Sequence, residues 1–292
     1  MRRRTGMRRI ELAALIDDLS FCAVPLTFKR IEQDSVLGTA VASGFLWREG
    51  EDWFLVTNWH NVTGINPLTL EHLGGFTPSH VTLSLKFEIS RATDSRLIGV
   101  KDYTVPLYGH GGPLWLEHPS GPNVDCVALM FKIPPDTGLA TKPLNDHPFD
   151  DFYSPSVGDD CFILGYPKGL RGAGSTPLWK RGSIASEPNL GVNGEPIVLI
   201  DSATRKGMSG SPVIARHSGV YLNGLSLNDK SVLGTVQCFL GIYSGRTDDD
   251  ELGLQIGRVW KSTVVTETIQ RGRRGKDPLD LVYPQPTAPA PN

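Results

Sequence analysis

The amino-acid sequence predicts an all-β protein made of two six-stranded antiparallel β-barrels, with short helices near its N- and C-termini. Glycine and proline are plentiful, at 32 and 22 of 292 residues, which favours short strands joined by turns over a helical bundle. Two sets of β-rich apolar runs, about six in each, are enough to close two small barrels. A doubly wound parallel sheet would instead need strands that alternate with helices.

Residues 1–20 are predicted to be a basic segment followed by an amphipathic helix over 8–20. Apolar residues recur there at helical spacing, namely Leu12, Leu15, Ile16 and Leu19. Acidic residues interrupt the apolar stretch that a signal peptide would need after the basic MRRRTGMRR, so we expect no export signal and a cytoplasmic protein. The sequence contains no run of 18 uncharged apolar residues, so no membrane span is predicted.

The first barrel is predicted over residues 21–133 and the second over 157–272, joined by a Pro- and Asp-rich linker at 134–156. The runs of the first barrel are FCAVPLTFKRI, VLGTAVASGFLW, WFLVTNW, VTLSLKFEI, LIGVKDYTVPLY and CVALMFKI. Those of the second are CFILGYP, LWKRGSIAS, PIVLIDSA, SPVIARH, VLGTVQCFLGIYSG and LGLQIGRVW. Ser262 is expected to cap a last helix that stops at Gly272. The basic and then Pro-rich residues 273–292 are predicted to be disordered.

Charge and cysteine content exclude several classes of partner. The 29 basic and 31 acidic residues leave a net charge of -2, so no overall field attracts nucleic acid or an anionic membrane. The four cysteines form no C-x-x-C pair that would suggest a zinc site. We expect no metal or cofactor. Most of them lie in apolar runs, which favours free buried thiols, although disulfides stay possible.

The stretch KGMSGSP at 206–212 contains the candidate nucleophile, Ser209. Its local composition alone favours a tight turn, because glycine reaches positive φ at no steric cost. A serine nucleophile also needs a histidine as base and a carboxylate that orients the imidazole. His60 ends the run FLVTNWH and Asp125 opens the run DCVALMF, both at the ends of predicted strands. Taken alone, each of these residues is more commonly structural.

The order His60, Asp125, Ser209 favours one class of serine chemistry. An α/β-hydrolase needs G-x-S-x-G, with its acid and base after the serine. The penicillin-binding type needs S-x-x-K, which the sequence lacks. A subtilisin-like order needs an acid before the base, and the acids there, such as Asp34 and Asp52, lie beside predicted turns.

These blocks resemble the chymotrypsin-like (trypsin-fold) serine proteases, especially the bacterial HtrA/Deg branch. LVTNWHNV around His60 is similar to T-N-x-H-V, DCVAL at Asp125 to D-[IV]-A-[VL]-[LI], and GMSGSPV at Ser209 to G-N-S-G-G-P-[LV]. The resemblance implies a double β-barrel and a serine endopeptidase that acts through an acyl-enzyme on a polypeptide substrate. The short stretch after residue 272 has no room for the PDZ module of HtrA proteases, so their regulation and trimer are not implied.

The resemblance also implies roles for individual residues. Ser209 is the nucleophile, His60 the base and Asp125 the orienting acid, while the backbone N–H groups of Gly207 and Ser209 form the oxyanion hole. Ser211 is the competing nucleophile. The base of the specificity pocket is expected at Ala203.

The pocket wall is expected at Gly241, Ile242 and Tyr243, which favours a small or medium apolar substrate side chain. Basic residues near the cleft would instead favour acidic substrates, namely Arg205, Lys206 and Arg246. The alternative function is a catalytically inactive or partner-activated protease fold that serves as a binding module. A regulatory protein partner would then bind the N-terminal helix or the C-terminal tail.

Overall fold

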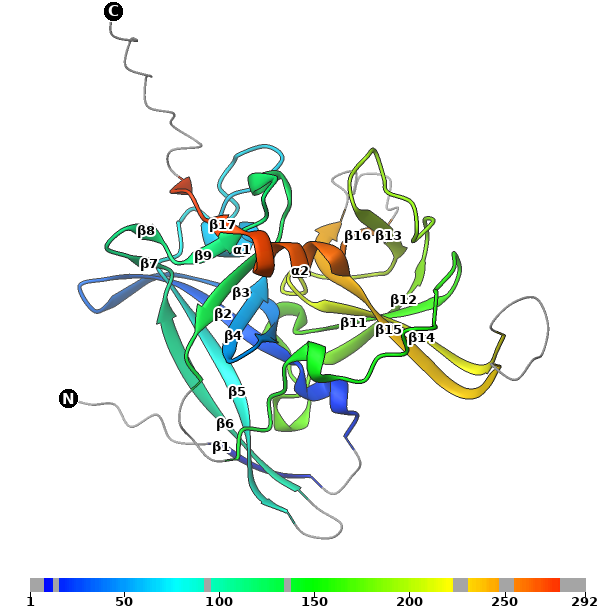
Figure 1. The fold of residues 1–292 in the computed structure, drawn as a ribbon. Helices are drawn as coiled ribbons and strands as arrows, with labels where there is room; N and C mark the ends of the chain where they lie inside the picture. Colours follow the sequence, from blue (N-terminus) through cyan, green and yellow to red (C-terminus); the bar gives the residue numbers. More distant parts are fainter. Residues whose placement is uncertain are drawn as a thin grey trace, which may run out of the picture.

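The structure is a computed structural model that describes residues 8–12, 16–91, 96–133, 138–222, 231–246 and 255–278. Two β-structures lie side by side, and helix α2 (Ser262–Arg271) lies between them (Figure 1). The predicted all-β fold of the double-barrel type is confirmed, except that the sheet of the first half has nine strands and, among the described residues, is not closed. None of the described helices is long and apolar enough to cross a membrane.

The second half forms a closed six-stranded antiparallel barrel, as predicted. Its strands in order are β11 (Asp160–Gly165), β12 (Leu178–Ile184), β13 (Ile197–Asp201), β16 (Ile256–Lys261), β15 (Val232–Arg246) and β14 (Pro212–Tyr221). Buried apolar side chains fill it, among them Ile163, Ile184, Val198, Val213 and Val259. The barrel thus gives a rigid support to the loop that carries Ser209, between β13 and β14.

The first half is a nine-stranded sheet rather than a closed six-stranded barrel. Its order is β1 (Arg8–Leu12), β6 (Arg96–Pro106), β5 (His80–Arg91), β2 (Ala23–Glu32), β3 (Ser35–Glu49), β4 (Asp52–Thr57), β10 (Val127–Phe131), β9 (Trp115–Glu117) and β17 (Arg273–Arg274). The six predicted strands are β2 to β6 and β10. Among the described residues no ladder joins β6 to β10, and three short strands extend the sheet at its edges.

Both ends of the chain differ from the prediction. The helix expected over 8–20 is absent: residues 8–12 form β1, antiparallel to β6, and Asp18–Phe21 is a 3₁₀-helix, η1. The exposed edge of β6 offers a full row of backbone hydrogen bonds, which outweighs the weak stability of a short helix. Arg273–Arg274, expected to be disordered, pair with β9 as β17. Residues 279–292 lie outside the described part of the chain.

The last helix is close to expectation, and the predicted linker is described only in part. Helix α2 begins at Ser262 with Lys261 as its N-cap residue, so Ser262 is not the cap, and Gly272 ends the helix as predicted. In the linker, 134–137 lie outside the described residues, while Leu144–Asp146 form a 3₁₀-helix (η3) whose Leu144 is buried. The domain boundary there stays a prediction.

The remaining short elements are α1 (Trp59–Thr63), the hairpin of β7 (Tyr108–Gly109) and β8 (Gly112–Pro113), and the 3₁₀-helices η2 (Gly121–Asn123), η4 (Pro167–Gly169) and η5 (Ala173–Ser175). All four cysteines are free, and three of them are buried. Burial raises the pKa of each thiol to about 12, so these groups pack as small apolar side chains and not as reactive thiolates.

A buried lysine bridges the two halves. The Lys86 side chain of β5 is fully buried, and its Nζ donates to the Ala23 carbonyl oxygen at 2.8 Å and to the Tyr166 hydroxyl at 3.3 Å. Tyr166 directly follows β11 of the second barrel. Burial disfavours the charged ammonium and lowers the pKa of Lys86 to about 7.

We predict that Lys86 makes stability depend on pH above neutrality. Between pH 7 and 10 the unfolded chain binds a proton at Lys86 that the folded protein has released, so the free energy of unfolding rises with pH by up to about 1.4 kcal/mol per unit. Below pH 7 both states are protonated and this contribution is constant. Urea unfolding at pH 7, 8 and 9 measures it, with Lys86→Met as the reference. Equal slopes for wild type and Lys86→Met would contradict the prediction.

Candidate active site

The ends of two neighbouring strands bring His60 and Asp125 together. His60 lies in α1, which directly follows β4, and Asp125 lies just before β10. Strands β4 and β10 are antiparallel, with Thr57 opposite Val127. The chain that leaves β4 therefore lies beside the chain that enters β10, although the two residues are far apart in sequence.

Asp125 holds His60 with both carboxylate oxygens. His60 Nδ1 lies 2.7 Å from Asp125 Oδ2, and the His60 backbone N–H donates to Oδ1 at 3.0 Å. The Ser244 hydroxyl also donates to Oδ2, and Asn58 Nδ2 donates to the Asp125 carbonyl oxygen at 2.7 Å. The carboxylate is thus fixed by groups of both halves of the molecule, since Ser244 belongs to β15.

The surroundings of Asp125 keep its carboxylate ionised. Its side chain is only 3% exposed, and burial alone would raise its pKa. The attraction of His60 and the hydrogen bonds from His60 and Ser244 outweigh burial, so the pKa of Asp125 is below its ordinary value. An ionised carboxylate only accepts hydrogen bonds, so the His60 proton is on Nδ1 and Nε2 is the free basic nitrogen.

Contacts with the first half shape the loop that carries Ser209. The Ser43 backbone N–H donates to the Ser209 carbonyl oxygen at 2.9 Å, and the Ser43 hydroxyl donates to the Gly207 carbonyl oxygen at 2.7 Å. Gly210 has φ +87°, and a Cβ there would lie 2.1 Å from the Ser43 carbonyl oxygen. Only glycine allows so close an approach of the loop to β3.

Two backbone amides of this loop are available to a ligand. Among the described residues, the N–H groups of Gly207 and Ser209 find no hydrogen-bond acceptor, whereas those of Met208 and Gly210 donate to the carbonyl oxygens of Arg205 and Tyr243. Gly207 has φ +96°, a conformation that favours glycine. Gly207 and Ser209 both border the cleft that also contains His60. The pair has the chemistry of a hole that binds an oxyanion.

Ser209 and His60 border one cleft of about 440 Å³ without a hydrogen bond between their side chains. Within the described structure the Ser209 hydroxyl forms no hydrogen bond with His60. Hydrogen bonds between catalytic groups are commonly long before substrate binds. Proton transfer between these two groups therefore requires that a hydrogen bond form between them.

Ser211 does not compete with Ser209 for this position. Its side chain is completely buried, and its hydroxyl has no hydrogen-bond partner among the described residues. A Cβ at Gly165 would lie 2.0 Å from the Ser211 hydroxyl oxygen, so this serine packs tightly against β11. Of the two serines, only Ser209 borders the cleft.

The residues expected to form the specificity pocket do not border the cleft. Ile242 and Tyr243 are buried, and Tyr243 packs inside the second barrel with its hydroxyl hydrogen-bonded to that of Thr204. Thr204 is next to Ala203, so the end of the Tyr243 side chain lies beside the residue expected at the base of the pocket. Gly241 packs against the backbone of Trp260.

The second-barrel wall of the cleft lies further along the chain than the prediction places it. Ser244 and Gly245 follow the expected wall, and Arg258 comes from the adjacent β16. The run FLGIYSG contains both β15 residues, so a shift of the expected wall by three positions would have found them. Neither Ser43 nor Arg258 was singled out from the sequence.

The two sides of the cleft differ in chemistry. The first half contributes apolar side chains, including Phe28, Val41, Leu68, Leu73 and Phe76, and the second contributes Lys206 and Arg258. Asp125 is the one carboxylate among the residues that border the cleft in the described structure, and it is occupied by His60 and Ser244.

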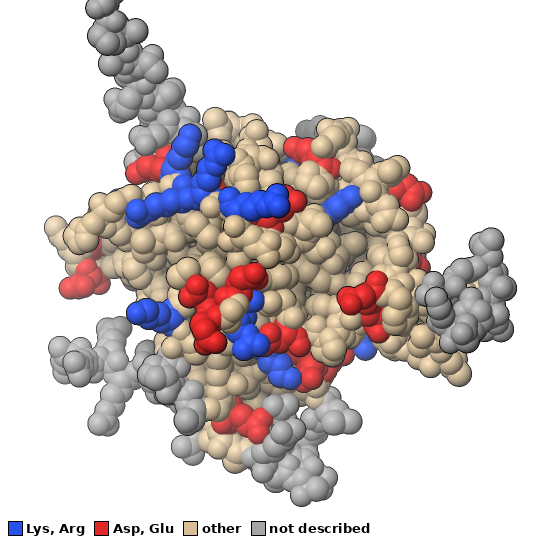
Figure 2. Space-filling model, in the orientation of Figure 1, with Lys and Arg blue, Asp and Glu red and all other residues tan. Residues whose placement is uncertain are grey.

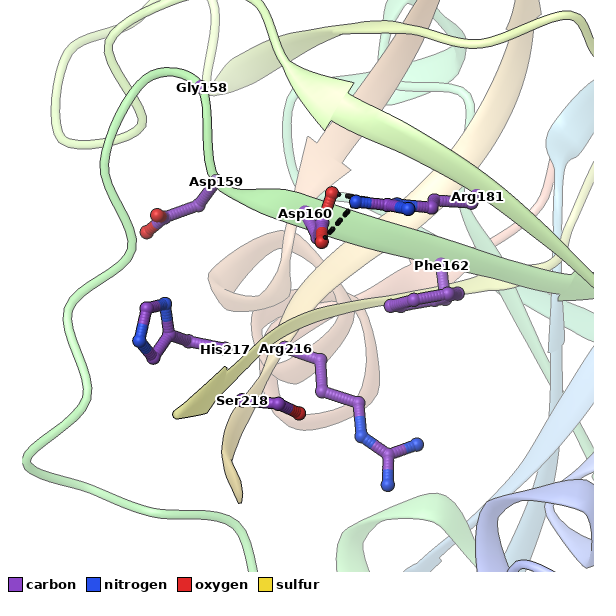
Figure 3. A pocket seen from close by; sticks show the side chains of 8 residues that line it. All are labelled: Gly158, Asp159, Asp160, Phe162, Arg181, Arg216, His217 and Ser218. Atoms are coloured by element: carbon purple, nitrogen blue, oxygen red, sulfur yellow. Dashed lines mark hydrogen bonds and ion pairs between the residues drawn. The ribbon is translucent and has the colours of Figure 1, made fainter. Parts of the chain in front are cut away.

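A second pocket, of about 570 Å³, is lined by residues of the second barrel (Figure 3). Asp160 and Arg181 form two hydrogen bonds of 2.8 Å there, and Arg216 forms an ion pair with Asp17 at 3.2 Å. This pocket shares no residue with the cleft. The described residues contain no group of three or more His, Cys, Asp or Glu side chains that could hold a metal ion.

Known proteins provide an independent comparison. Residues 42–221 match the family model of the trypsin-like peptidase domain, and this range contains His60, Asp125 and Ser209. Similar solved structures include the Rv3671c protease of M. tuberculosis in an inactive form, at 17% identity over 86% of this chain and 88% of that chain, with a TM-score of 0.43. Another is the MamO protease domain from Magnetospirillum magneticum, at 15% identity over 87% and 98%, with a TM-score of 0.45. No curated protein matches.

Because the family model covers more than half of the sequence, the chain belongs to the trypsin-like peptidase domain family.

Proposed function

We propose that the protein is a serine endopeptidase that cleaves peptide bonds through an acyl-enzyme. The observation that carries the proposal is the grouping around one cleft of Ser209, a His60 whose Nδ1 is held by buried Asp125, and two amides without acceptors. Each of these features also occurs in structural roles, but together they are the groups that acyl transfer requires.

The proposed reaction has two halves. Ser209 Oγ attacks the peptide carbonyl carbon while His60 Nε2 takes the hydroxyl proton, and the N–H groups of Gly207 and Ser209 donate to the resulting oxyanion. The C–N bond then breaks, and His60 gives its proton to the departing amine. Water attacks the Ser209 ester with His60 again as base, which releases the acid product and restores the hydroxyl. Asp125 stabilises the charged imidazole throughout.

The substrate residue whose carbonyl is attacked is proposed to carry a small apolar side chain. The support is the position of Tyr243, whose buried side chain is hydrogen-bonded to Thr204, next to the expected pocket base at Ala203. A ring in this place leaves little room for a long side chain.

A partner-activated protease is the second candidate. One observation favours it: the Ser209 hydroxyl and His60 border the same cleft without a hydrogen bond between them. Figure 2 shows lysine and arginine side chains gathered near β17, where the exposed residues are Arg271, Arg273, Arg274 and Lys276. An acidic protein partner that binds the start of the C-terminal tail would fit this surface.

We expect a fluorophosphonate to modify wild-type protein once, at Ser209, as measured by intact-mass spectrometry. Ser209→Ala and His60→Ala should carry no adduct, because one lacks the nucleophile and the other the base. Ser211→Ala is the matched control and should react like wild type, since this hydroxyl is buried. Labelling of Ser209→Ala, or its loss in Ser211→Ala, would contradict the assignment. No adduct on any of these proteins would favour the partner-activated candidate.

We predict that Tyr243 limits the size of the accepted side chain. Wild type should cleave a random peptide library after small residues, and Tyr243→Ala should accept larger apolar ones because the ring no longer fills the space. Tyr243→Phe keeps the ring, so its preference should stay that of wild type. Mass spectrometry of the cleaved peptides measures the preference. Preferred cleavage after Lys or Arg by wild type would refute this size limit.

A further inference from the structure

A cation lies in the cleft close to the candidate catalytic groups. Arg258 of β16 borders the cleft together with His60, Ser209, Ser244 and Gly245. Antiparallel pairing of β15 with β16 sets Tyr243 opposite Val259 and Arg246 opposite Gly257. Arg258 therefore lies across from the segment of Ser244 and Gly245, and Ser244 itself donates to Asp125.

The guanidinium of Arg258 is held in place yet keeps free donors. Its side chain is 17% exposed, and its carbon Cζ lies 5.8 Å from the centre of the Trp260 ring. Its one hydrogen bond in the described structure joins Nη2 to Glu195 Oε2 at 3.5 Å, the long limit for such a bond. A guanidinium has five N–H donors, so most of them are available to a ligand.

The surroundings of Arg258 favour an anionic ligand. Lys206 is exposed at the same cleft, and Asp125, the carboxylate among its lining residues, is already bound to His60 and Ser244. Gly245 has no side chain that could cover Arg258, and a Cβ there would meet no atom of the described residues within 4 Å. A carboxylate and a partly buried guanidinium form strong, often two-pronged hydrogen bonds.

We propose that Arg258 forms a subsite for an acidic side chain of the bound polypeptide, aspartate or glutamate, within a few residues of the cleaved bond. This inference rests on the proposed function, because it assumes that a polypeptide occupies the cleft. The acidic residue is distinct from the small residue whose carbonyl is attacked, because Tyr243 and Arg258 lie on different sides of the second barrel wall: Tyr243 packs inside it, and Arg258 borders the cleft.

The competing explanation is purely structural. In it, Arg258 serves only to pair with Glu195 and to cover Trp260. The two explanations differ for Glu195→Gln, which removes the acidic neighbour and leaves the cation in the cleft. If Arg258 binds substrate, this variant keeps or strengthens the preference for acidic peptides, because a competing carboxylate is gone.

Binding to Ser209→Ala protein tests the proposal without any need for turnover. The probes are two pools of fluorescent octapeptides with glutamate or glutamine at four successive positions and random uncharged residues elsewhere. Fluorescence anisotropy measures both dissociation constants. We expect the glutamate pool to bind about 10-fold or more tightly than the glutamine pool, because a charge-assisted hydrogen bond is stronger than a neutral one. Adding Arg258→Gln should abolish this difference.

The controls separate a specific subsite from general attraction. Glu195→Gln should retain the glutamate preference, and so should Arg181→Gln, which removes a cation of the second pocket (Figure 3). Arg258→Lys keeps the positive charge but loses the paired N–H donors of the guanidinium, so we expect an intermediate preference for glutamate. This variant tests the proposal even if Arg258→Gln does not fold. Equal binding of the two pools, no binding of either, or an unchanged preference in Arg258→Gln or Arg258→Lys would overturn the proposal. Failure of the proposed function would appear separately, as absence of phosphonylation of wild type.

Discussion

The arrangement of the candidate site depends on one buried carboxylate. Asp125 accepts hydrogen bonds from the ring and backbone of His60 in the first half and from Ser244 in the second. Because an unpaired buried charge is costly, the two halves must pack so that these donors reach it. The same contacts orient the imidazole, so the packing of the fold and the chemistry of the site satisfy a single constraint.

A second set of contacts positions the nucleophile. Ser43 on β3 holds the Ser209 loop through its backbone and its hydroxyl, and Gly210 allows the close approach. The amides of Gly207 and Ser209, which find no acceptor among the described residues, belong to residues that border the cleft. Lys86 adds a buried polar contact between the same halves, and the low pKa of its ammonium group indicates that this contact is made at a desolvation cost.

Three features were predictable from the sequence: the fold class, the closed second barrel and the grouping of His60 with Asp125. The alternation of apolar runs and turns indicates the strands, and the order of the three motifs indicates the grouping. The N-terminal strand was not, since β1 depends on the free edge of β6. The cleft wall was placed too early because only the folded structure shows that Ile242 and Tyr243 are buried. Ser43 and Ser244 were missed because their roles arise only from contacts across the two halves. Arg258 was missed because only the folded structure shows which residues border the cleft.

The rate of phosphonylation in Asp125→Asn tests the central claim most directly. An amide in place of the carboxylate favours the wrong imidazole tautomer, so the second-order rate constant should fall by about 10³- to 10⁴-fold while the circular dichroism spectrum is retained. Ser244→Ala, which removes one of the donors to Asp125, should react faster than Asp125→Asn and more slowly than wild type. A folded Asp125→Asn that reacts at the wild-type rate would contradict the account.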